Sequence, residues 1–408
     1  MGGDHEDLVW RRNILEQVLT VRQEVASTVG TETVPIDSIS GRTIAEPVVA
    51  DRDMPEHDFA TMDGFAFDAT DPYPLTVVEG EVYPENKPSA LESGEAIRVA
   101  TGAPIPEAAN AVLKREDATV EDGLLHGTDI SPGTYTYERG GNVSEGDVLF
   151  ERGDRLSAKD AILLGDLGKS RVDVTETVST GVLATGTEIH EGRSRDLDSP
   201  MLSGLVRSWG HEATYEGTVP DEYDRIESSI EELATEYDVV ITTGGTSVGH
   251  KDHVIRALES LGSVVFHRVR LRPGKPIALA RLPDHDAIVF AIPGKPIGAH
   301  TVATLVMRPF FTGETSIPTV PASMERAVSL GPDGFEYAIP VTLSTNAGDR
   351  RAMPLGHSDS PLQVYDDRFD PSVLSSSTRA SQADGIVITR TALEADENVE
   401  VVPYSAIE

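Results

Sequence analysis

The feature that most constrains the fold of this chain is a regular alternation of apolar strands and amphipathic helices from Val172 to Phe311. The segments Thr180–Thr185 and Val239–Thr242 are predicted as buried strands, and apolar residues recur at helical spacing from 226 to 237 between them. The order strand, helix, strand, helix, strand predicts a parallel sheet with helices on both faces. The expected fold class is therefore α/β, with a doubly wound domain at its centre.

Helix boundaries inside this region are marked by local signals. One helix is predicted to begin with Ser199 as its cap and Pro200 at its first position, and to end before Gly210. The remaining elements are predicted as a helix over 254–261, strands over 264–269 and 287–291, and a long helix over 297–310.

The chain outside this region has a different composition. An N-terminal helix is predicted from Leu8 to Val25, and a short helix from Ser157 to Leu167 with Ser157 as its cap. Between Pro35 and Phe150, short alternating runs separated by turn residues indicate β-rich structure. Short strands beyond Gly313 predict a small C-terminal β domain.

The candidate site lies where the parallel strands end, because ligands of doubly wound sheets bind at the carboxyl edge. The loops there contain Thr185, Gly186 and Glu188; Asp221; Gly244, Gly245, Thr246, Ser247 and Gly249, followed by Asp252; and Pro293, Gly294 and Lys295. Backbone amides in such glycine-rich turns bind anions, although a Gly-Gly pair can also be only a tight connection.

Positive charge is concentrated near the same loops. Residues 264–311 contain seven basic side chains and only two acidic ones, in a chain whose formal charge is −34. Arg272, Lys275 and Lys295 each adjoin Pro or Gly, which indicates that they meet a phosphate or another oxyanion. The alternative is that some of the seven cations pair with acidic neighbours across the fold.

Three carboxylates follow three different strands. Glu188, Asp221 and Asp252 could share a hard cation, and Mg²⁺ suits a site with few protein carboxylates. The competing interpretation is that these carboxylates face solvent, as most do in an acidic chain.

A second class of chemistry matches the same loop. Residues 245–249 fit the G-x-S-x-G pattern of a hydrolase nucleophile elbow, with Ser247 as nucleophile and Asp286 and His300 in the required order. The position of His300 within a predicted helix disfavours this alternative.

Composition limits the setting. Cysteine is absent, so disulfides and thiolate metal sites are excluded. Acidic residues number 68 against 34 basic ones, of which only seven are lysine, a balance that argues against nucleic-acid binding and predicts a halophilic protein. A charged start and the lack of a long apolar stretch predict a cytoplasmic protein without membrane contact.

Motifs in a fixed order give the chain a family resemblance. They are Met62-Asp63-Gly64, Thr101-Gly102-Ala103-Pro104, Thr185-Gly186-Thr187-Glu188, Thr243–Gly249 with Asp252, Arg272-Pro273-Gly274-Lys275-Pro276, Pro293-Gly294-Lys295-Pro296 and Ala383-Asp384-Gly385. Over nearly its whole length the chain resembles the MoeA-type molybdopterin molybdotransferases, a family that also forms one domain of gephyrin. Its composition makes it haloarchaeal-like.

The resemblance implies a multidomain α/β architecture. It comprises an elongated central domain at 1–50 and 140–172, a β-rich lid domain at 51–139, a molybdopterin-binding α/β domain at 173–315 and a C-terminal β-barrel-like domain at 316–408. It also implies a homodimer whose active site lies between two subunits.

The resemblance further implies a reaction and its residues. Molybdate is inserted into adenylyl-molybdopterin in a Mg²⁺-dependent reaction that releases AMP, and a MogA/MoaB-type adenylyltransferase is a possible partner. The implied catalytic residues are Asp63 and Thr101 from the lid of one subunit, and Glu188, Asp221, Asp252 and Lys275 from the other. The implied substrate-binding residues are Thr185, Gly186, Gly244, Gly245, Thr246, Ser247, Gly249, Arg272, Pro273, Lys275, Pro293, Gly294 and Lys295.

Three departures from the family pattern keep alternatives open. The chain has Phe59-Ala60-Thr61 where the family has Asn-Ser-Ala, Asn142 in place of an acid, and Lys295 in place of Asn. A paralogue that prefers tungstate, or a non-catalytic molybdopterin-binding or scaffold protein, would fit these changes.

Overall fold

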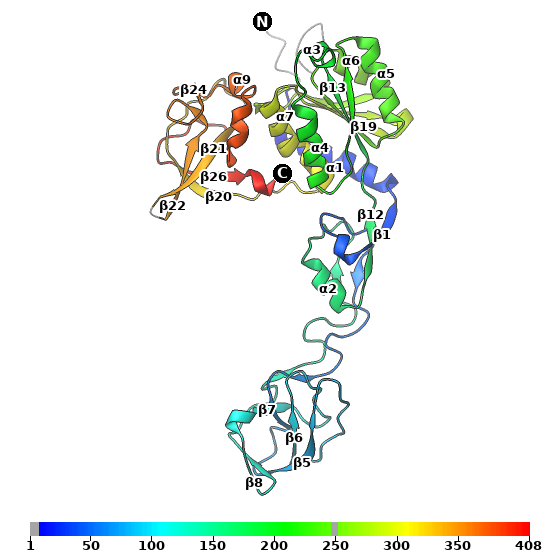
Figure 1. Cartoon of the computed structure of the whole chain (residues 1–408), viewed down its shortest axis with the longest axis vertical. Coiled ribbons are helices and arrows are strands. Elements are labelled where there is room, and N and C mark those ends of the chain that lie inside the picture. The colour runs from blue at the N-terminus through cyan, green and yellow to red at the C-terminus, as the bar shows by residue number, and fades with distance from the viewer. Residues whose placement is uncertain (1–7, 246–251, 347) are drawn as a thin grey trace. The chain divides into compact units, whose positions relative to one another are not determined.

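The computed structural model describes residues 8–245, 252–346 and 348–408, and the chain divides into two units. The first unit comprises residues 1–32, 40–42 and 175–408, and the second comprises residues 33–39 and 43–174. The chain passes between them near β1 (Thr31–Pro35) and β12 (Arg171–Thr175) (Figure 1). In sequence, the second unit is thus an insertion into the first.

A six-stranded sheet with the order β14-β13-β15-β19-β18-β16 forms the α/β part of the first unit. Its parallel strands are β13 (Thr180–Thr185), β14 (Thr214–Val219), β15 (Val239–Thr243) and β19 (Ala287–Ile292). Strand β18 (Ala278–Leu282) runs antiparallel to both of its neighbours, β19 and the edge strand β16 (Ser263–His267). The parallel arrangement is confirmed for four strands. Strand β18 was not predicted from the sequence, and it runs antiparallel to β19 because only a short turn, Pro283–His285 with Asp286, joins the two strands.

Helices cover both faces of this sheet (Figure 1). They are α3 (Thr187–His190), α4 (Asp198–Ser208), α5 (Tyr223–Ala234), α6 (His253–Leu261), α7 (Pro296–Val302) and α8 (Arg308–Thr312), together with α1 (Arg11–Thr28). Along β15, Val239 and Ile241 are buried in one apolar core with α1, α4, α7 and α8, whereas Val240 is buried in another with α5 and α6. Alternation along one strand therefore places apolar side chains on both faces.

Some helix boundaries differ from the sequence-based expectation. Helix α4 begins at Asp198, and Asp196 Oδ1 accepts hydrogen bonds from the amides of Asp198 and Ser199, both at 3.1 Å. The prediction that Ser199 is the cap was wrong, because the preceding carboxylate accepts the free amides of the first turn. Ser157 is not a cap either, since its amide and hydroxyl donate to Asp160 at the start of α2. The predicted 297–310 helix contains a π-helical turn, Ala303–Met307.

The C-terminal part of the first unit contains a closed β-barrel. Its strands are β20 (Val320–Met324), β21 (Glu336–Asn346), β22 (Asp349–Pro354), β25 (Gly385–Thr389) and β26 (Asn398–Pro403). The sheet closes because β21 pairs with both β22 and β25. The short strand β17 (Leu271–Arg272) pairs with β21. Outside the barrel lie β23 (Gly356–His357), β24 (Gln363–Tyr365) and α9 (Pro371–Leu374).

The second unit is mostly β structure. Its six-stranded sheet consists, in spatial order, of β7 (Ala111–Lys114), β4 (Gly64–Phe67), β6 (Glu95–Val99), β5 (Leu75–Val82), β9 (Leu124–His126) and β8 (Thr119–Glu121). Two smaller sheets pair β3 (Phe59–Ala60) with β10 (Thr136–Tyr137), and β2 (Val48–Val49) with β11 (Val148–Phe150). The only helix longer than one turn among its described residues is α2 (Asp160–Asp166). The predicted β-rich composition of this region is confirmed.

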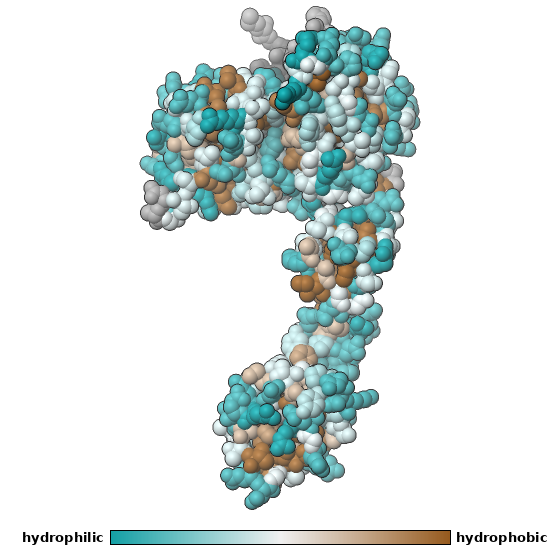
Figure 2. Space-filling model, in the orientation of Figure 1, coloured by the Kyte–Doolittle hydropathy of each residue, from teal (hydrophilic) through white to brown (hydrophobic). Residues whose placement is uncertain are grey.

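Hydrophilic residues predominate on the face of the molecule shown in Figure 2, and the apolar patches there are small and scattered. Among the described residues, none of the helices has the length and apolar character needed to cross a bilayer.

Candidate functional site

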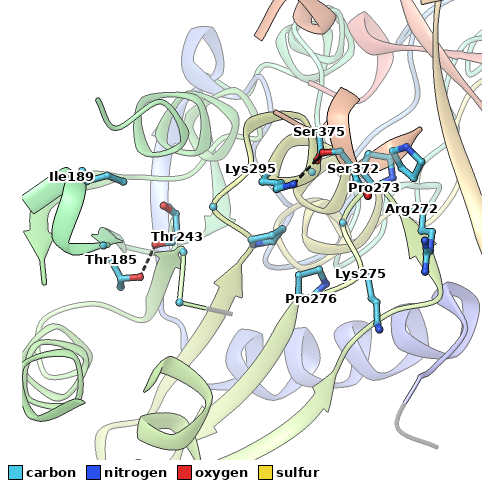
Figure 3. A pocket seen from close by; sticks show the side chains of 18 of the residues that line it. Thr185, Ile189, Thr243, Arg272, Pro273, Lys275, Pro276, Lys295, Ser372 and Ser375 are labelled. Atoms are coloured by element: carbon cyan, nitrogen blue, oxygen red, sulfur yellow. Dashed lines mark hydrogen bonds between the residues drawn. The ribbon is translucent and has the colours of Figure 1, made fainter. Parts of the chain in front are cut away.

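A pocket of about 790 Å³ opens at the carboxyl edge of the parallel strands (Figure 3). Its walls come from the loops after β13, β14, β15 and β19, from the loop after β17, and from α9. Twelve residues from the sequence-based site line it, namely Thr185, Gly186, Glu188, Asp221, Gly244, Gly245, Arg272, Pro273, Lys275, Pro293, Gly294 and Lys295. The convergence of separate loops follows from parallel strands ending at one edge.

Close backbone contacts hold three of these loops together. The Gly244 amide donates to the Ile292 carbonyl at 3.0 Å, and Thr185 Oγ1 donates to the Thr243 carbonyl at 3.0 Å. Gly244 has φ +86°, and a Cβ there would lie 2.6 Å from the Thr185 carbonyl oxygen. A Cβ on Gly294 would lie 3.0 Å from the Gly244 Cα. Glycine is therefore required at position 244, because both its conformation and its neighbour exclude a side chain.

The pocket is basic on the side of the β17 loop. Arg272, Lys275 and Lys295 all line it, as their sequence positions predicted. The Arg272 guanidinium lies 4.2 Å from the centroid of the Phe335 ring, while its Nε is shielded from solvent and has no hydrogen-bond partner in the part of the chain that is described. Lys295 Nζ donates to the Ser372 carbonyl at 3.0 Å (Figure 3). Such an arrangement suits an oxyanion or phosphate ligand.

Other members of the basic cluster have structural partners instead. Arg281 forms two hydrogen bonds with Glu24, at 2.7 and 3.0 Å. The buried Arg308 donates to the Ser316 carbonyl, and Arg270 donates to the Leu8 carbonyl. The alternative interpretation therefore holds for Arg281, which pairs with an acidic side chain across the fold, whereas anion binding by the three pocket cations stays a prediction.

The three predicted metal carboxylates are placed differently. Glu188 and Asp221 line the pocket, and the Asp221 amide donates a hydrogen bond to Thr187 Oγ1 at 3.0 Å. A Cβ on Gly186 would lie 3.2 Å from Glu188 Oε1, so the Glu188 carboxylate lies over Gly186. Asp252 instead caps α6, with Oδ1 accepting from the Ile255 amide at 3.4 Å.

Burial raises the pKa of Asp252, and the hydrogen bond from Ile255 only partly opposes this effect. Within residues 8–245, 252–346 and 348–408, no three His, Asp or Glu side chains are grouped so that they could share a metal ion. The residues present therefore offer two pocket carboxylates for Mg²⁺, which commonly retains several water ligands.

Asp63 and Thr101 belong to the second unit and are in direct contact. Asp63 Oδ1 accepts hydrogen bonds from both the amide and the hydroxyl of Thr101, each at 2.7 Å. The Thr101 hydroxyl and then its amide lower the pKa of Asp63. The sequence analysis thus grouped two residues 38 positions apart that form one hydrogen-bonded pair.

Phe59 and Asn142, two of the positions that depart from the family pattern, make specific contacts within the second unit. The Phe59 ring lies 5.2 Å from the Tyr137 ring, between centroids. Asn142 Nδ2 donates to Asp166 Oδ2 at 3.2 Å, a bond that an acidic side chain at position 142 could not make while ionised.

The hydrolase alternative does not find support in the described residues. Asp286 precedes β19 whereas Gly245 follows β15, and these two strands are parallel, so Asp286 and Gly245 lie at opposite edges of the sheet. His300 Nε2 contacts Glu408 Oε1 at 2.8 Å rather than Asp286. Thr246, Ser247 and Gly249, including the supposed nucleophile, lie outside the described residues.

One wall of the pocket, from the C-terminal part, was not predicted from the sequence. Pro371, Ser372 and Ser375 line the pocket, and Asp370 caps α9 by accepting from the Ser372 and Val373 amides at 2.9 and 3.1 Å. The Asp-Pro-Ser sequence at 370–372 is a helix-start signal that could have placed α9. Nothing in the local sequence indicates that α9 would meet the α/β part.

Comparisons with known proteins agree with this geometry. Residues 11–168 match the family model for the MoeA N-terminal region (domain I and II), and residues 181–313 match a probable molybdopterin binding domain. A molybdopterin molybdenumtransferase from Synechococcus elongatus is 31% identical over 299 residues, covering 68% of this chain and 74% of the relative. The corresponding protein from Haemophilus influenzae is 31% identical over 281 residues, covering 66% of this chain and 69% of the relative.

A solved structure extends the match to the whole fold. The molybdopterin biosynthesis MoeA protein from Pyrococcus horikoshii superposes with a TM-score of 0.74 at 28% identity, covering 97% of this chain and 99% of that one. Sequence, architecture and the position of the pocket lead to one assignment: this chain belongs to the MoeA-type molybdopterin molybdenumtransferase family.

Proposed function

We propose that this protein inserts molybdenum, supplied as molybdate, into adenylyl-molybdopterin and releases AMP. The observation that carries the proposal is the pocket that combines Arg272, Lys275 and Lys295 with the carboxylates of Glu188 and Asp221. Both substrates are anions, so three cations at one site favour binding of the pair. The relatives named molybdopterin molybdenumtransferase support the same reaction.

The chain's own residues bind and orient the substrates in this proposal. The guanidinium of Arg272 and the ammonium of Lys275 neutralise negative charge on the molybdate and the phosphates. Glu188 and Asp221 are the carboxylates that would hold Mg²⁺. When bound, Mg²⁺ supplies charge stabilisation for cleavage of the phosphoanhydride. Asp252 acts from outside the pocket, by fixing the start of α6.

The second unit supplies the remaining part of the proposed site. We assign Asp63 and Thr101 to the lid that acts on the pocket of a second subunit in a homodimer. The Thr101 hydrogen bonds, which lower the pKa of Asp63, favour its ionised form, so the carboxylate acts there as a hydrogen-bond acceptor. The setting we propose is the cytoplasm of a halophile, with a MogA/MoaB-type adenylyltransferase supplying the substrate.

The direct test is AMP release from adenylyl-molybdopterin in about 2 M KCl, a salt concentration that screens the acidic surface. We expect release that requires both an oxyanion and Mg²⁺. Asp221→Asn should reduce the rate on the order of 100-fold and raise the Mg²⁺ concentration needed for half-maximal rate. Asp224→Asn, the same chemical change on the exposed side of α5, is the matched control and should leave the rate unchanged.

The outcomes separate the open alternatives. A higher rate with tungstate than with molybdate would identify a tungstate-preferring paralogue. Tight molybdopterin binding without AMP release under any condition would contradict the proposed reaction and favour a binding or scaffold role. Equal loss of activity in Asp221→Asn and Asp224→Asn would contradict the assignment of Asp221 to the site.

A further inference from the structure

One wall of the pocket is a very short helix. Helix α9 consists of only Pro371–Leu374, yet Pro371, Ser372 and the following Ser375 line the pocket (Figure 3). A single helical turn has little stability of its own, because forming it orders several residues for one backbone hydrogen bond. Contacts from outside must therefore fix the position of this wall.

Two hydrogen bonds from the start of α7 provide such contacts. Lys295 Nζ donates to the Ser372 carbonyl at 3.0 Å, and the Ile297 amide donates to the Ser375 carbonyl, also at 3.0 Å. Ser375 Oγ in turn donates to the same Ser372 carbonyl at 3.0 Å. The Ile297 amide belongs to the first turn of α7, where amides lack partners within the helix. Of the two hydrogen bonds from the start of α7, the one from Lys295 is made by a side chain and the one from Ile297 by the backbone.

We propose that Lys295 is a positioning residue that holds the α9 wall in place for the anionic substrate. The inference rests on the proposed function, and it assigns Lys295 a role different from that of the other cations in the pocket. Its ammonium group donates to a neutral carbonyl on the opposite wall, so the side chain connects the loop after β19 with α9. Removing it leaves the Ile297 amide as the remaining one of the two bonds.

Lys275 supplies an internal comparison, because it has the same charge and lines the same pocket. The Lys275 carbonyl accepts from the Val269 amide at 2.9 Å and from the Ile277 amide at 3.1 Å. Its position is therefore fixed by the segment between β16 and β18, without α9. Loss of Lys275 should remove pocket charge only, whereas loss of Lys295 should also release α9.

The test measures amide hydrogen exchange of residues 370–377 in the full chain, in about 2 M KCl and without substrate. Lys295→Met should increase exchange of this segment by about fivefold, the effect of losing one hydrogen bond. Lys275→Met should leave it unchanged, and Lys295→Arg, which retains a cationic donor, should restore much of the protection. Lys159→Met, at an exposed position directly before α2, serves as the remote control.

A second measurement links the wall to ligand binding. Calorimetry with tungstate as the probe should show weaker binding for both Lys295→Met and Lys275→Met, and in turnover Lys295→Met should raise the oxyanion KM more than it lowers kcat. Unchanged exchange of residues 370–377 in Lys295→Met would overturn the positioning role and leave Lys295 as a pocket charge alone. Because exchange is measured without turnover, that result is distinguishable from failure of the proposed reaction.

Discussion

At the scale of single residues, Asp198 is a buried carboxyl group at the first position of α4. It is only 5% exposed, and its Oδ1 has no hydrogen-bond partner among the described residues. Burial, and secondly the charge of Asp196, raise the pKa of Asp198 from 3.8 to about 6. The folded chain therefore holds this proton more tightly than the unfolded chain does.

The sign of the effect on stability follows from this difference. Between pH 3.8 and about 6 the folded state binds more protons at this site than the unfolded state, so stability falls as the pH rises through that window. Above about pH 6 the folded state bears the full free-energy cost of the buried charge. The pKa difference between 3.8 and about 6 corresponds to at most about 3 kcal/mol of unfolding free energy. Below the unfolded pKa the cost disappears.

We therefore expect Asp198→Asn to stabilise the protein by about 1–3 kcal/mol at pH 7.5 and to have little effect at pH 4. The amide is similar in shape but carries no charge that must be desolvated. Urea unfolding at both pH values in the same KCl concentration measures the difference. Asp224→Asn, on an exposed position, should show neither the gain nor its pH dependence. A loss of stability at pH 7.5 would show that the Asp198 carboxylate has a partner that offsets its burial.

The predictable part of the site is the part carried by short local motifs. Gly244, Arg272 and Lys295 stand in loops next to strand ends, so a sequence pattern places them at the sheet edge. Ser372 and Ser375 reach the pocket through a contact between separate parts of the first unit, and no periodicity in either part encodes that contact. Asp252 caps α6 in the structure, a role that the sequence could not separate from metal binding, because an acidic residue before a helix can serve either purpose.

At the scale of elements, fully buried strands were predicted well, and a strand with a charged side chain in its run was not. β13, β15 and β19 lie where the sequence predicted them, because each is a mostly apolar run that is buried along its whole length. Strand β18 was missed because Arg281 interrupts its apolar run, and this side chain pairs with Glu24 of α1. That partner lies 257 positions away, so its stabilising effect is not visible in the local sequence.

The loop packing at the pocket yields a prediction about two glycines. A Cβ on Gly294 would lie 3.0 Å from Gly244 Cα and 3.4 Å from its nitrogen, and these backbone atoms cannot move without separating the loops. Gly294→Ala should destabilise the protein by about 1–3 kcal/mol and weaken tungstate binding.

The matched control is Gly204→Ala in α4, where a Cβ would meet nothing within 4 Å. This change should stabilise the protein by up to about 1 kcal/mol, since alanine favours the helix. Thermal unfolding of both variants provides the comparison. Stabilisation by both would mean that the loops after β15 and β19 are not in fixed contact.

At the scale of the whole molecule, charge is the dominant property. The chain carries 68 acidic and 34 basic residues, which gives −34 at neutral pH. Several arginines form ion pairs, including Arg326 with Asp359 and Arg351 with Asp396, but exposed pairs of this kind contribute little. The folded state therefore bears a large excess of like charges, and salt should decide how much repulsion they exert.

We expect the melting temperature to rise by about 10 °C or more from 0.2 to 2 M KCl, as screening shortens to a few ångströms. The double variant Glu232→Lys with Glu236→Lys changes two exposed positions, in and just beyond α5, and the net charge from −34 to −30. It should reach half of the rise in melting temperature at a lower KCl concentration than the unmodified chain. Glu232→Asp with Glu236→Asp keeps the charge and is the matched control. Because both pairs change the same two exposed side chains, a difference between them reports charge. Identical salt dependence of the two double variants would refute self-repulsion as the cause, and with it the physical basis for expecting a halophilic protein.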